Sequence, residues 1–144
     1  MGKRRRAREL AIQVLFHLEF SNDDPGAVFG LVCEHFKSQG SNRSFSKRLV
    51  LGVCEKKQEL DTLIINASKH WRLERMSSVD RCILRLAAFE MLFLEDVPPR
   101  VSIDEAVEMG KKFGSEYSAG FLNGVLDNIY SSLLGECRIK QGGA

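Results

Sequence analysis

The sequence predicts an all-α protein, a compact bundle of about six or seven helices in two subdomains. Apolar residues recur at intervals of three and four along most of the chain, which is the spacing of one helix face. No segment of useful length alternates apolar and polar residues as a strand would. With 144 residues, 44% of them hydrophobic, the chain can bury a core without disulfides or metals. We expect one domain over 1–144, with subdomains at about 1–75 and 76–137 and a flexible tail at 138–144.

The first helix carries the basic start of the chain, MGKRRRAREL. Its apolar stripe begins at Ala7 and continues to Leu18. Arg4, Arg5 and Arg8 lie within one turn of Ala7, so they are expected to extend this helix rather than precede it as a disordered tag. The segment is therefore predicted to be an arginine-rich helical terminus.

Two further helical regions complete the first half of the chain. In SNDDPG, Asp24 is a natural N-cap and Pro25 suits the first helical position, so a helix is expected to start there and to end near SQGSN. A longer helical region covers roughly 43–71. It is expected to break near Glu55–Gln58, where four polar residues interrupt the apolar pattern.

Capping signals mark the helices of the second half. Ser77 and Asp80 resemble a capping box that opens the middle helix, and the prolines of DVPPR end that helix. Ser102 and Glu105, in VSIDEA, resemble a second capping box. It is expected to open a helix that ends at Gly114.

Charge is unevenly distributed along the chain. Five of the 21 Lys and Arg residues lie in the first eight positions: Lys3, Arg4, Arg5, Arg6 and Arg8. The other 16 are fewer than the 19 Asp and Glu residues, so the rest of the chain carries a net negative charge. Arginine suits phosphate because its planar group donates two parallel hydrogen bonds and keeps its charge. The cluster alone fits a nucleic acid best, and after it a solvated terminus or an anionic membrane surface.

A second candidate site lies in KKFGSEYSAGFLNGVLDN. Lys111 and Lys112 close one helix, and the last helix is predicted from about Ser118 to Leu134, stopped by Gly135. The free backbone N–H groups at the start of that last helix would suit a phosphate.

Two aromatic residues lie near the same turn. Tyr117 and Phe121 could stack on unpaired bases, although Phe121 also continues the apolar pattern, so a core position is the alternative interpretation. Asn123 interrupts the apolar face and is expected to satisfy a backbone group.

No pattern in the sequence indicates an active site. GxSxG, GxGxxG, HExxH and the P-loop are all missing. Glu90 lies on the apolar side of the middle helix, where a structural role is favoured over that of a catalytic acid. The histidines and cysteines lack the close spacing of zinc ligands, so we interpret the cysteines as buried or half-buried hydrophobes: Cys33, Cys54, Cys82 and Cys137. We expect neither enzymatic activity nor a cofactor.

Targeting signals are missing as well. No run approaches the roughly 18 uninterrupted apolar residues of a membrane span, and no apolar segment of signal-peptide type follows the basic start. We expect a cytoplasmic protein without a membrane partner.

Four segments, in chain order, resemble the NusB family of transcription antitermination factors. They are RRRARELAIQVLF, VDRCILRLAAFEM, VPPRVSIDEAVEMGKKFG and FLNGVLDNI. The resemblance covers essentially the entire chain and implies an all-helical fold of two subdomains divided near residue 75. It also implies binding to the boxA element of nascent RNA together with a small-subunit ribosomal protein, NusE. That assembly joins RNA polymerase in an antitermination complex and supports transcription of ribosomal RNA operons, without a cofactor or a chemical step.

The resemblance also implies roles for individual residues. Those expected to contact RNA are Arg4, Arg5, Arg6, Arg8, Lys111, Lys112, Tyr117, Ser118, Phe121 and Asn123. Those expected to face the ribosomal protein are Phe16, Asp80 and Arg85.

Three positions depart from the family pattern. Phe16 replaces a usual tyrosine and so lacks a hydroxyl that could assist the protein contact. Gly120 stands where a basic residue is frequent, which would weaken RNA contact. Gly110 stands where alanine is usual, which would loosen its helix by about 1 kcal/mol.

Two alternatives stay open. The second hypothesis is an RNA-binding module associated with an rRNA-modifying enzyme, because a related helical domain precedes RNA cytosine methyltransferases. The end of the chain at Ala144, with no methyltransferase domain, argues against this hypothesis. The third is a homodimer in which an apolar face of one bundle covers another and hides the arginines.

Overall fold

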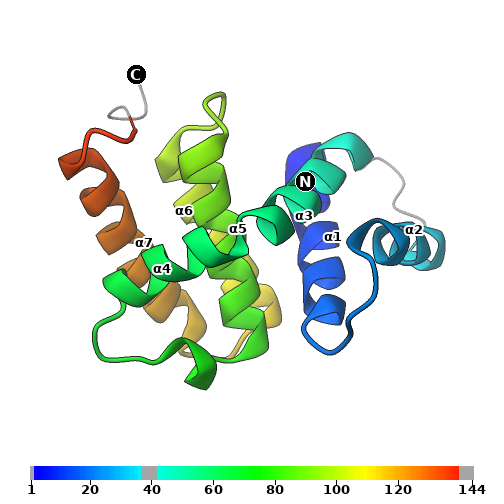
Figure 1. Cartoon of the computed structure of the whole chain (residues 1–144), viewed down its shortest axis with the longest axis horizontal. Coiled ribbons are helices and arrows are strands. Elements are labelled where there is room, and N and C mark those ends of the chain that lie inside the picture. The colour runs from blue at the N-terminus through cyan, green and yellow to red at the C-terminus, as the bar shows by residue number, and fades with distance from the viewer. Residues whose placement is uncertain (1, 37–41, 140–144) are drawn as a thin grey trace. The chain divides into compact units, whose positions relative to one another are not determined.

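A computed structural model describes residues 2–36 and 42–139, which form seven α-helices and one short 3-10 helix (Figure 1). The elements are α1 (Lys3–Leu18), α2 (Pro25–Phe36), α3 (Arg43–Glu55), α4 (Lys57–Ala67), η1 (Leu73–Arg75), α5 (Ser78–Phe93), α6 (Pro99–Phe113) and α7 (Ser118–Gly135). These residues contain no strand, so the all-α prediction is confirmed for them. The helical basic terminus is confirmed too, because α1 begins at Lys3.

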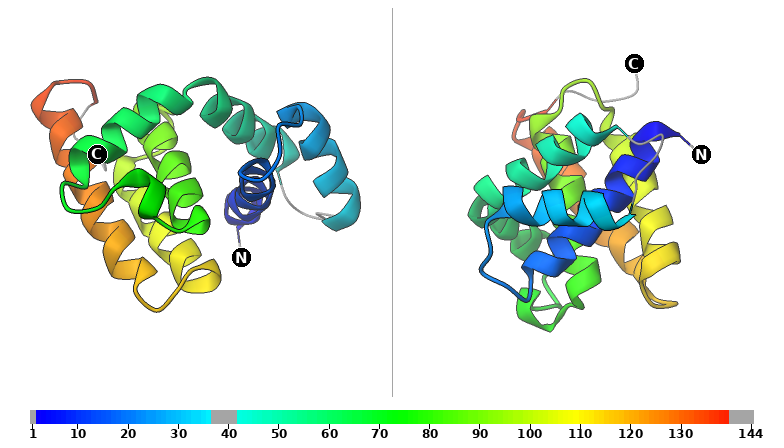
Figure 2. Two further views of the ribbon diagram at one scale, coloured as in Figure 1. Left: turned by 60° about the horizontal axis from the view of Figure 1, so that its bottom comes forward. Right: turned by 90° about the vertical axis from the view of Figure 1, so that its right-hand side faces the viewer.

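The chain divides into two units, Met1–Glu55 and Lys56–Ala144. The expected boundary was near residue 75, and the division falls earlier because α4 packs on α5 and α7 (Figure 2). The helix break lies at Lys56 (φ −100°, ψ 14°), inside the interval predicted from the polar residues. The predicted tail 138–144 lies mostly outside the described residues. Its first residue, Arg138, forms ion pairs with Glu59 at 3.2 Å and Glu136 at 3.7 Å.

The first unit is a cluster of three helices in which α1 packs against both α2 and α3. Ser46 of α3 is fully buried, and its hydroxyl donates a 2.7 Å hydrogen bond to the carbonyl of Ala7. This bond joins α3 to the basic end of α1. Asp24 caps α2 as predicted, because its carboxylate accepts a hydrogen bond from the backbone N–H of Ala27 at 3.1 Å.

The second unit is built around α5, whose residues from Cys82 to Met91 are all buried. α6 and α7 pack against α5 and against each other, and α4 lies across α5 and α7 (Figures 1 and 2). A helix buried on all sides needs partners for its polar side chains. Glu90, 1% exposed, accepts a hydrogen bond of 2.9 Å from the Ser102 hydroxyl of α6. This contact gives Glu90 a structural role.

One predicted cap is present and one is wrong. Ser77 caps α5 by accepting a hydrogen bond of 3.1 Å from the Asp80 backbone N–H. α6, however, begins at Pro99, where a proline costs little because the first N–H of a helix has no partner in the helix. Ser102 therefore lies inside α6 and bonds to Glu90 instead of capping.

The prediction for the cysteines is wrong at one position. Cys33 and Cys82 are buried and Cys54 is half-buried, but Cys137 is exposed just after the end of α7. Its backbone has a positive φ of 58°, because the chain reverses there after the helix.

Candidate nucleic-acid interface

The basic end of α1 rests on an aromatic ring of α3. The guanidinium carbons of Arg4 and Arg8 lie 4.5 Å and 5.5 Å from the centre of the Phe45 ring. The ring's electron-rich face attracts a cation, and Phe45 itself is only 5% exposed. Phe45 therefore fixes the position of the arginine cluster against α3.

The four arginines differ in exposure. Arg4 and Arg6 are exposed and Arg5 is half-buried, whereas Arg8 is 3% exposed. Arg8 lies one turn further along α1, next to Ala7, where Ser46 bonds α3 to α1. A phosphate has little access to a guanidinium buried to this extent. We therefore assign Arg8 to the packing of α1 on α3 and retain Arg4, Arg5 and Arg6 as candidate RNA contacts.

The second candidate segment comprises the end of α6, a short turn and the start of α7. Lys111 and Lys112 are exposed in the last turn of α6, and Nζ of Lys111 lies 3.6 Å from Oε1 of Glu108. Tyr117, at the N-cap of α7, is 76% exposed. Two cations thus lie before the turn, and an accessible aromatic ring lies after it.

Two polar residues of this segment differ in what they can offer a ligand. Ser118 is 1% exposed, and its hydroxyl accepts a hydrogen bond of 2.9 Å from the Ser115 backbone N–H, so it shapes the turn. Asn123 is exposed, and its amide donates a hydrogen bond of 3.4 Å to Asp127. The expectation that Asn123 satisfies a backbone group is therefore wrong, and Asn123 stays a candidate contact.

Phe121 is half-buried and meets an aromatic residue that the sequence interpretation overlooked. Its ring centre lies 5.9 Å from that of Trp71, with an interplanar angle of 76°. Trp71 is 60% exposed. The missed signal was the tetrapeptide KHWR, in which the chain's one tryptophan stands among basic residues.

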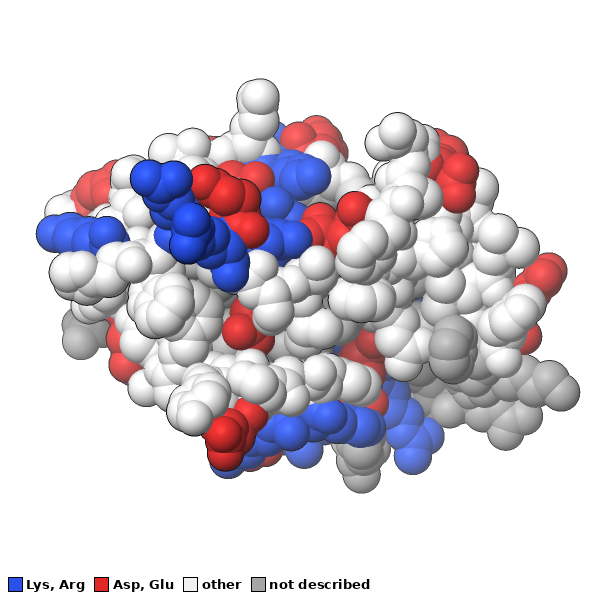
Figure 3. Space-filling model, turned by 90° about the horizontal axis from the view of Figure 1, so that it is seen from below, with Lys and Arg blue, Asp and Glu red and all other residues white. Residues whose placement is uncertain are grey.

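Basic side chains are grouped rather than continuous. On the face shown in Figure 3, Lys and Arg gather in separate groups with Asp and Glu beside them. On this face, contact with a polyanion would therefore be made by local groups of cations.

Comparison with known proteins places the chain in a family. The profile of the NusB family matches residues 5–131. This chain belongs to the NusB family. A transcription antitermination protein NusB from Desulfatibacillum aliphaticivorans is 46% identical over 133 residues, which cover 92% of this chain and 93% of that protein.

Solved NusB structures share the fold. The structure of T. maritima NusB matches with a TM-score of 0.80 and 35% identity, over 91% of this chain and 93% of that one. A crystal structure of the antitermination factors NusB and NusE in complex with dsRNA matches with a TM-score of 0.79 and 31% identity. That match covers 89% of this chain and 96% of the other.

The residues expected to face NusE have different surroundings in this chain. Phe16, 39% exposed, makes an edge contact with Phe20 at 5.1 Å. Asp80 is half-buried, and within the described part of the chain its buried Oδ1 has no hydrogen-bond partner. Arg85 is 7% exposed and donates to both carboxylate oxygens of Asp61, at 2.7 Å and 3.2 Å. We therefore assign Arg85 to the interior of the second unit and no longer treat it as a partner contact.

The two glycines that depart from the NusB pattern are not equivalent. A Cβ at Gly110 would lie 2.5 Å from Cδ1 of Leu122, so the missing side chain allows α6 and α7 to approach. A Cβ at Gly120 would meet nothing within 4 Å, so this exposed position has room for a basic side chain.

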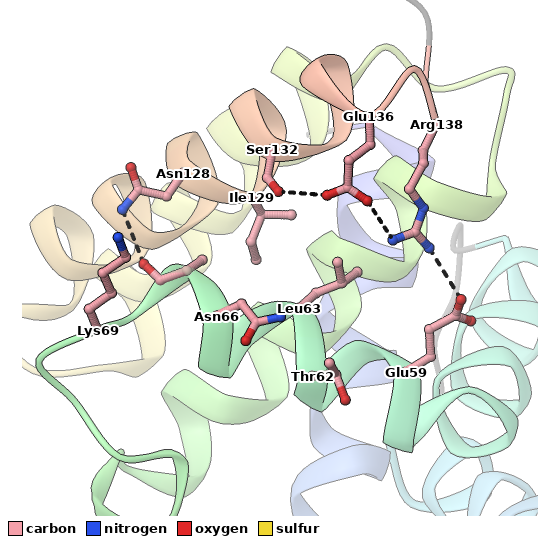
Figure 4. Close-up of a pocket in the computed structure, with 11 residues that line it drawn as sticks. Glu59, Thr62, Leu63, Asn66, Lys69, Asn128, Ile129, Ser132, Glu136 and Arg138 are labelled. Atoms are coloured by element: carbon pink, nitrogen blue, oxygen red, sulfur yellow. Dashed lines mark hydrogen bonds and ion pairs between the residues drawn. The ribbon is translucent and has the colours of Figure 1, made fainter.

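A pocket of about 650 Å³ lies between α4 and α7 (Figure 4). Glu59, Arg138 and Glu136 form a chain of ion pairs at one end of it, and Ser132 donates a hydrogen bond of 3.0 Å to Glu136. The residues that line the pocket include neither His nor Cys. Within 2–36 and 42–139, no three His, Cys, Asp or Glu residues are placed to hold a metal. No helix in those same ranges has both the length and the apolarity to cross a bilayer.

Proposed function

We propose that this chain is an RNA-binding transcription antitermination factor that works without a catalytic step. It binds boxA-type RNA together with the ribosomal protein NusE and, within the RNA polymerase antitermination complex, supports processive transcription of ribosomal RNA operons. Membership of the NusB family supports this proposal, as does the 31% identical chain solved with NusE and RNA. A protein with this role meets nascent RNA in the cytoplasm.

The observation that carries the proposal is the arginine cluster of α1, in which Arg4 and Arg6 are exposed and Arg4 lies over the Phe45 ring. An anchored cation loses less conformational entropy on meeting a phosphate than one on a disordered tag. We assign the first group of RNA contacts to Arg4, Arg5 and Arg6. The second group, in the other unit, comprises Lys111, Lys112, Tyr117, Phe121 and Asn123.

The experiment that tests this function is binding of labelled boxA RNA and of a scrambled control, with and without NusE, followed by fluorescence anisotropy. We expect a preference for boxA that increases when NusE is present. Equal binding of both RNAs, whether or not NusE is added, would contradict the proposal.

We assign Phe16 and Asp80 to the contact with NusE, and Asp80 gives the sharper test. Asp80→Lys reverses a half-buried charge in the first turn of α5, where an acid is favoured by the helix dipole. We expect it to weaken NusE binding at least tenfold, equivalent to about 1.4 kcal/mol, while RNA binding by the chain alone changes less. Titration with labelled NusE measures the first and RNA anisotropy the second. Equal losses in both would remove Asp80 from the partner surface, and a melting curve would reveal a variant that fails to fold.

A further inference from the structure

The second unit carries an exposed aromatic surface that the RNA contacts assigned above do not fully use. Trp71 is 60% exposed and meets the half-buried ring of Phe121 edge to face. Tyr117, 76% exposed, is the N-cap of α7, and its carbonyl accepts a hydrogen bond of 3.1 Å from the Phe121 backbone N–H, so it lies one helical turn before Phe121. We term these three residues, Trp71, Tyr117 and Phe121, the aromatic platform. We propose that the platform binds an unpaired RNA base, with Trp71 as the residue on which the base stacks, and this inference rests on the proposed function.

The start of the Trp71 segment is fixed in place. The Trp71 backbone N–H donates to the Ser68 carbonyl at 3.1 Å, and the buried Ser68 hydroxyl donates to the Ile64 carbonyl of α4 at 2.6 Å. The Asn128 amide of α7 donates to the Ala67 carbonyl at 3.1 Å (Figure 4). The end of α4 is thereby tied to α7, the helix that contains Phe121 and has Tyr117 as its N-cap.

The far end of the segment is anchored as well. The Arg81 guanidinium of α5 donates to the carbonyls of Leu73 and Met76, at 3.2 Å and 2.6 Å, and Met76 is 6% exposed. A tryptophan held from both sides is positioned before a ligand arrives, so little ordering entropy is lost on binding. Its exposure therefore results from a defined backbone rather than from a loose loop.

Charge around the platform favours RNA over an apolar protein surface. Lys69, His70 and Arg72 flank Trp71 and are all exposed, and Lys112 is exposed near the end of α6, ahead of the turn to α7. Glu116, beside Tyr117, is an acid at the same turn. The centres of protein interfaces are depleted of charged residues, whereas sites for single-stranded nucleic acid combine aromatic rings with cations. Every base has a face that can stack on an aromatic ring. The neighbouring cations would meet the backbone phosphates on either side of the stacked base.

The chain provides its own probe, since Trp71 is its one tryptophan. The protein is titrated with single-stranded boxA RNA in the presence of NusE, and tryptophan emission is followed at an excitation wavelength that tyrosine does not absorb. Any tryptophan that NusE contributes is replaced beforehand. Anisotropy of a label on the RNA measures total binding independently. We expect quenching of Trp71 that saturates together with the anisotropy.

Variants separate stacking from packing. Trp71→Ala should weaken RNA binding by a factor of about 5 to 150, the range measured for loss of base–aromatic stacking. Trp71→Phe keeps a ring against Phe121 and should retain most of the affinity. Val101→Ala, at an exposed apolar residue of α6, is the matched control and should leave affinity unchanged. Melting curves identify any variant that is unfolded.

The outcomes distinguish this inference from the proposed function. RNA binding by anisotropy without quenching, and with unchanged affinity of Trp71→Ala, would overturn the inference and leave the function standing. Quenching by NusE in the absence of RNA would assign the platform to the protein partner and would likewise overturn it. No RNA binding by either readout would overturn the proposed function itself, and the inference with it.

Discussion

Arg4 and Arg8 lie over the same Phe45 ring, yet Arg4 is exposed and Arg8 is buried. The sequence predicts that arginines four residues apart share the outer surface of this helix, which is correct for Arg4 and wrong for Arg8. The sequence does not show which of these two arginine side chains is covered by α3. That depends on the point along α1 at which the Ser46 hydroxyl meets the Ala7 carbonyl. The same holds for Ser118, which the family resemblance places among the RNA contacts, because its hydroxyl accepts a hydrogen bond from the Ser115 backbone N–H within the turn to α7.

The first prediction concerns Arg8. Arg8→Ala removes a desolvated cation–ring contact and the packing of its side-chain stem, so we expect the free energy of unfolding to fall by about 1–2 kcal/mol. Arg6→Ala, at an exposed position two residues earlier, should leave stability unchanged. Urea unfolding followed by circular dichroism measures both. Similar stabilities for the two variants would show that Arg8 does not hold α1 to α3.

At the scale of helices, a start is predictable where the side chain of the capping residue bonds to the first turn of its own helix. Asp24 and Ser77 each accept a hydrogen bond from a backbone N–H three residues on, so sequence patterns predict the starts of α2 and α5. The start of α6 is predicted wrongly, because the Ser102 side chain bonds to Glu90 of α5 instead of capping α6. The break at Lys56 was visible as a polar interruption, whereas the packing of α4 on α5 and α7 has no local signal.

The second prediction concerns the contact of α6 with α7. Helix propensity alone predicts that Gly110→Ala stabilises the protein by about 1 kcal/mol. The structure predicts the opposite, because the new Cβ would lie 2.5 Å from Cδ1 of Leu122, a fully buried side chain with little space to move. Since overpacking costs about 1–3 kcal/mol, we expect a net loss of stability.

Chemical unfolding of matched variants checks the sign. Gly124→Ala changes an exposed glycine of α7 whose Cβ would meet nothing within 4 Å, and it should stabilise the protein by about 1 kcal/mol. Adding Leu122→Val to Gly110→Ala should recover part of the lost stability by freeing space. A gain in stability from Gly110→Ala alone would mean that Leu122 moves aside.

At the scale of the molecule, the candidate RNA contacts lie in both units, the arginines in the first and the lysines and aromatic platform in the second. Both groups were accessible from sequence where they form local motifs, as in MGKRRRAREL and KKFGSEYSAGF. Trp71 has a local signal in KHWR, but its contact with Phe121 has none, because only the packing of the α4–α5 connection against α7 brings the two rings together. The candidate site is thus predictable as segments, and its side-chain exposures follow from tertiary contacts.

The last prediction counts phosphates across the whole molecule. Each phosphate contact on a single strand adds about 0.7 to the slope of log affinity against log salt concentration. Replacing Arg4, Arg5 and Arg6 by alanine leaves the Arg8 anchor intact, so folding should persist while the slope falls by up to about 2. Gly120→Lys should raise the slope by about 0.7, because it adds a cation at an open position near the platform. RNA anisotropy at several KCl concentrations, with NusE present, measures the slopes.

A variant with three exposed cations of α3 and α4 replaced by alanine, Lys47, Arg48 and Lys57, carries the same net charge as the arginine variant. If both variants lose the same slope, the long-range field of the protein governs binding and no specific contact is needed. If only the arginine variant does, the contacts are local to α1. An unchanged slope in the arginine variant would exclude the cluster from the RNA interface, and any remaining salt dependence would then have to come from the second unit.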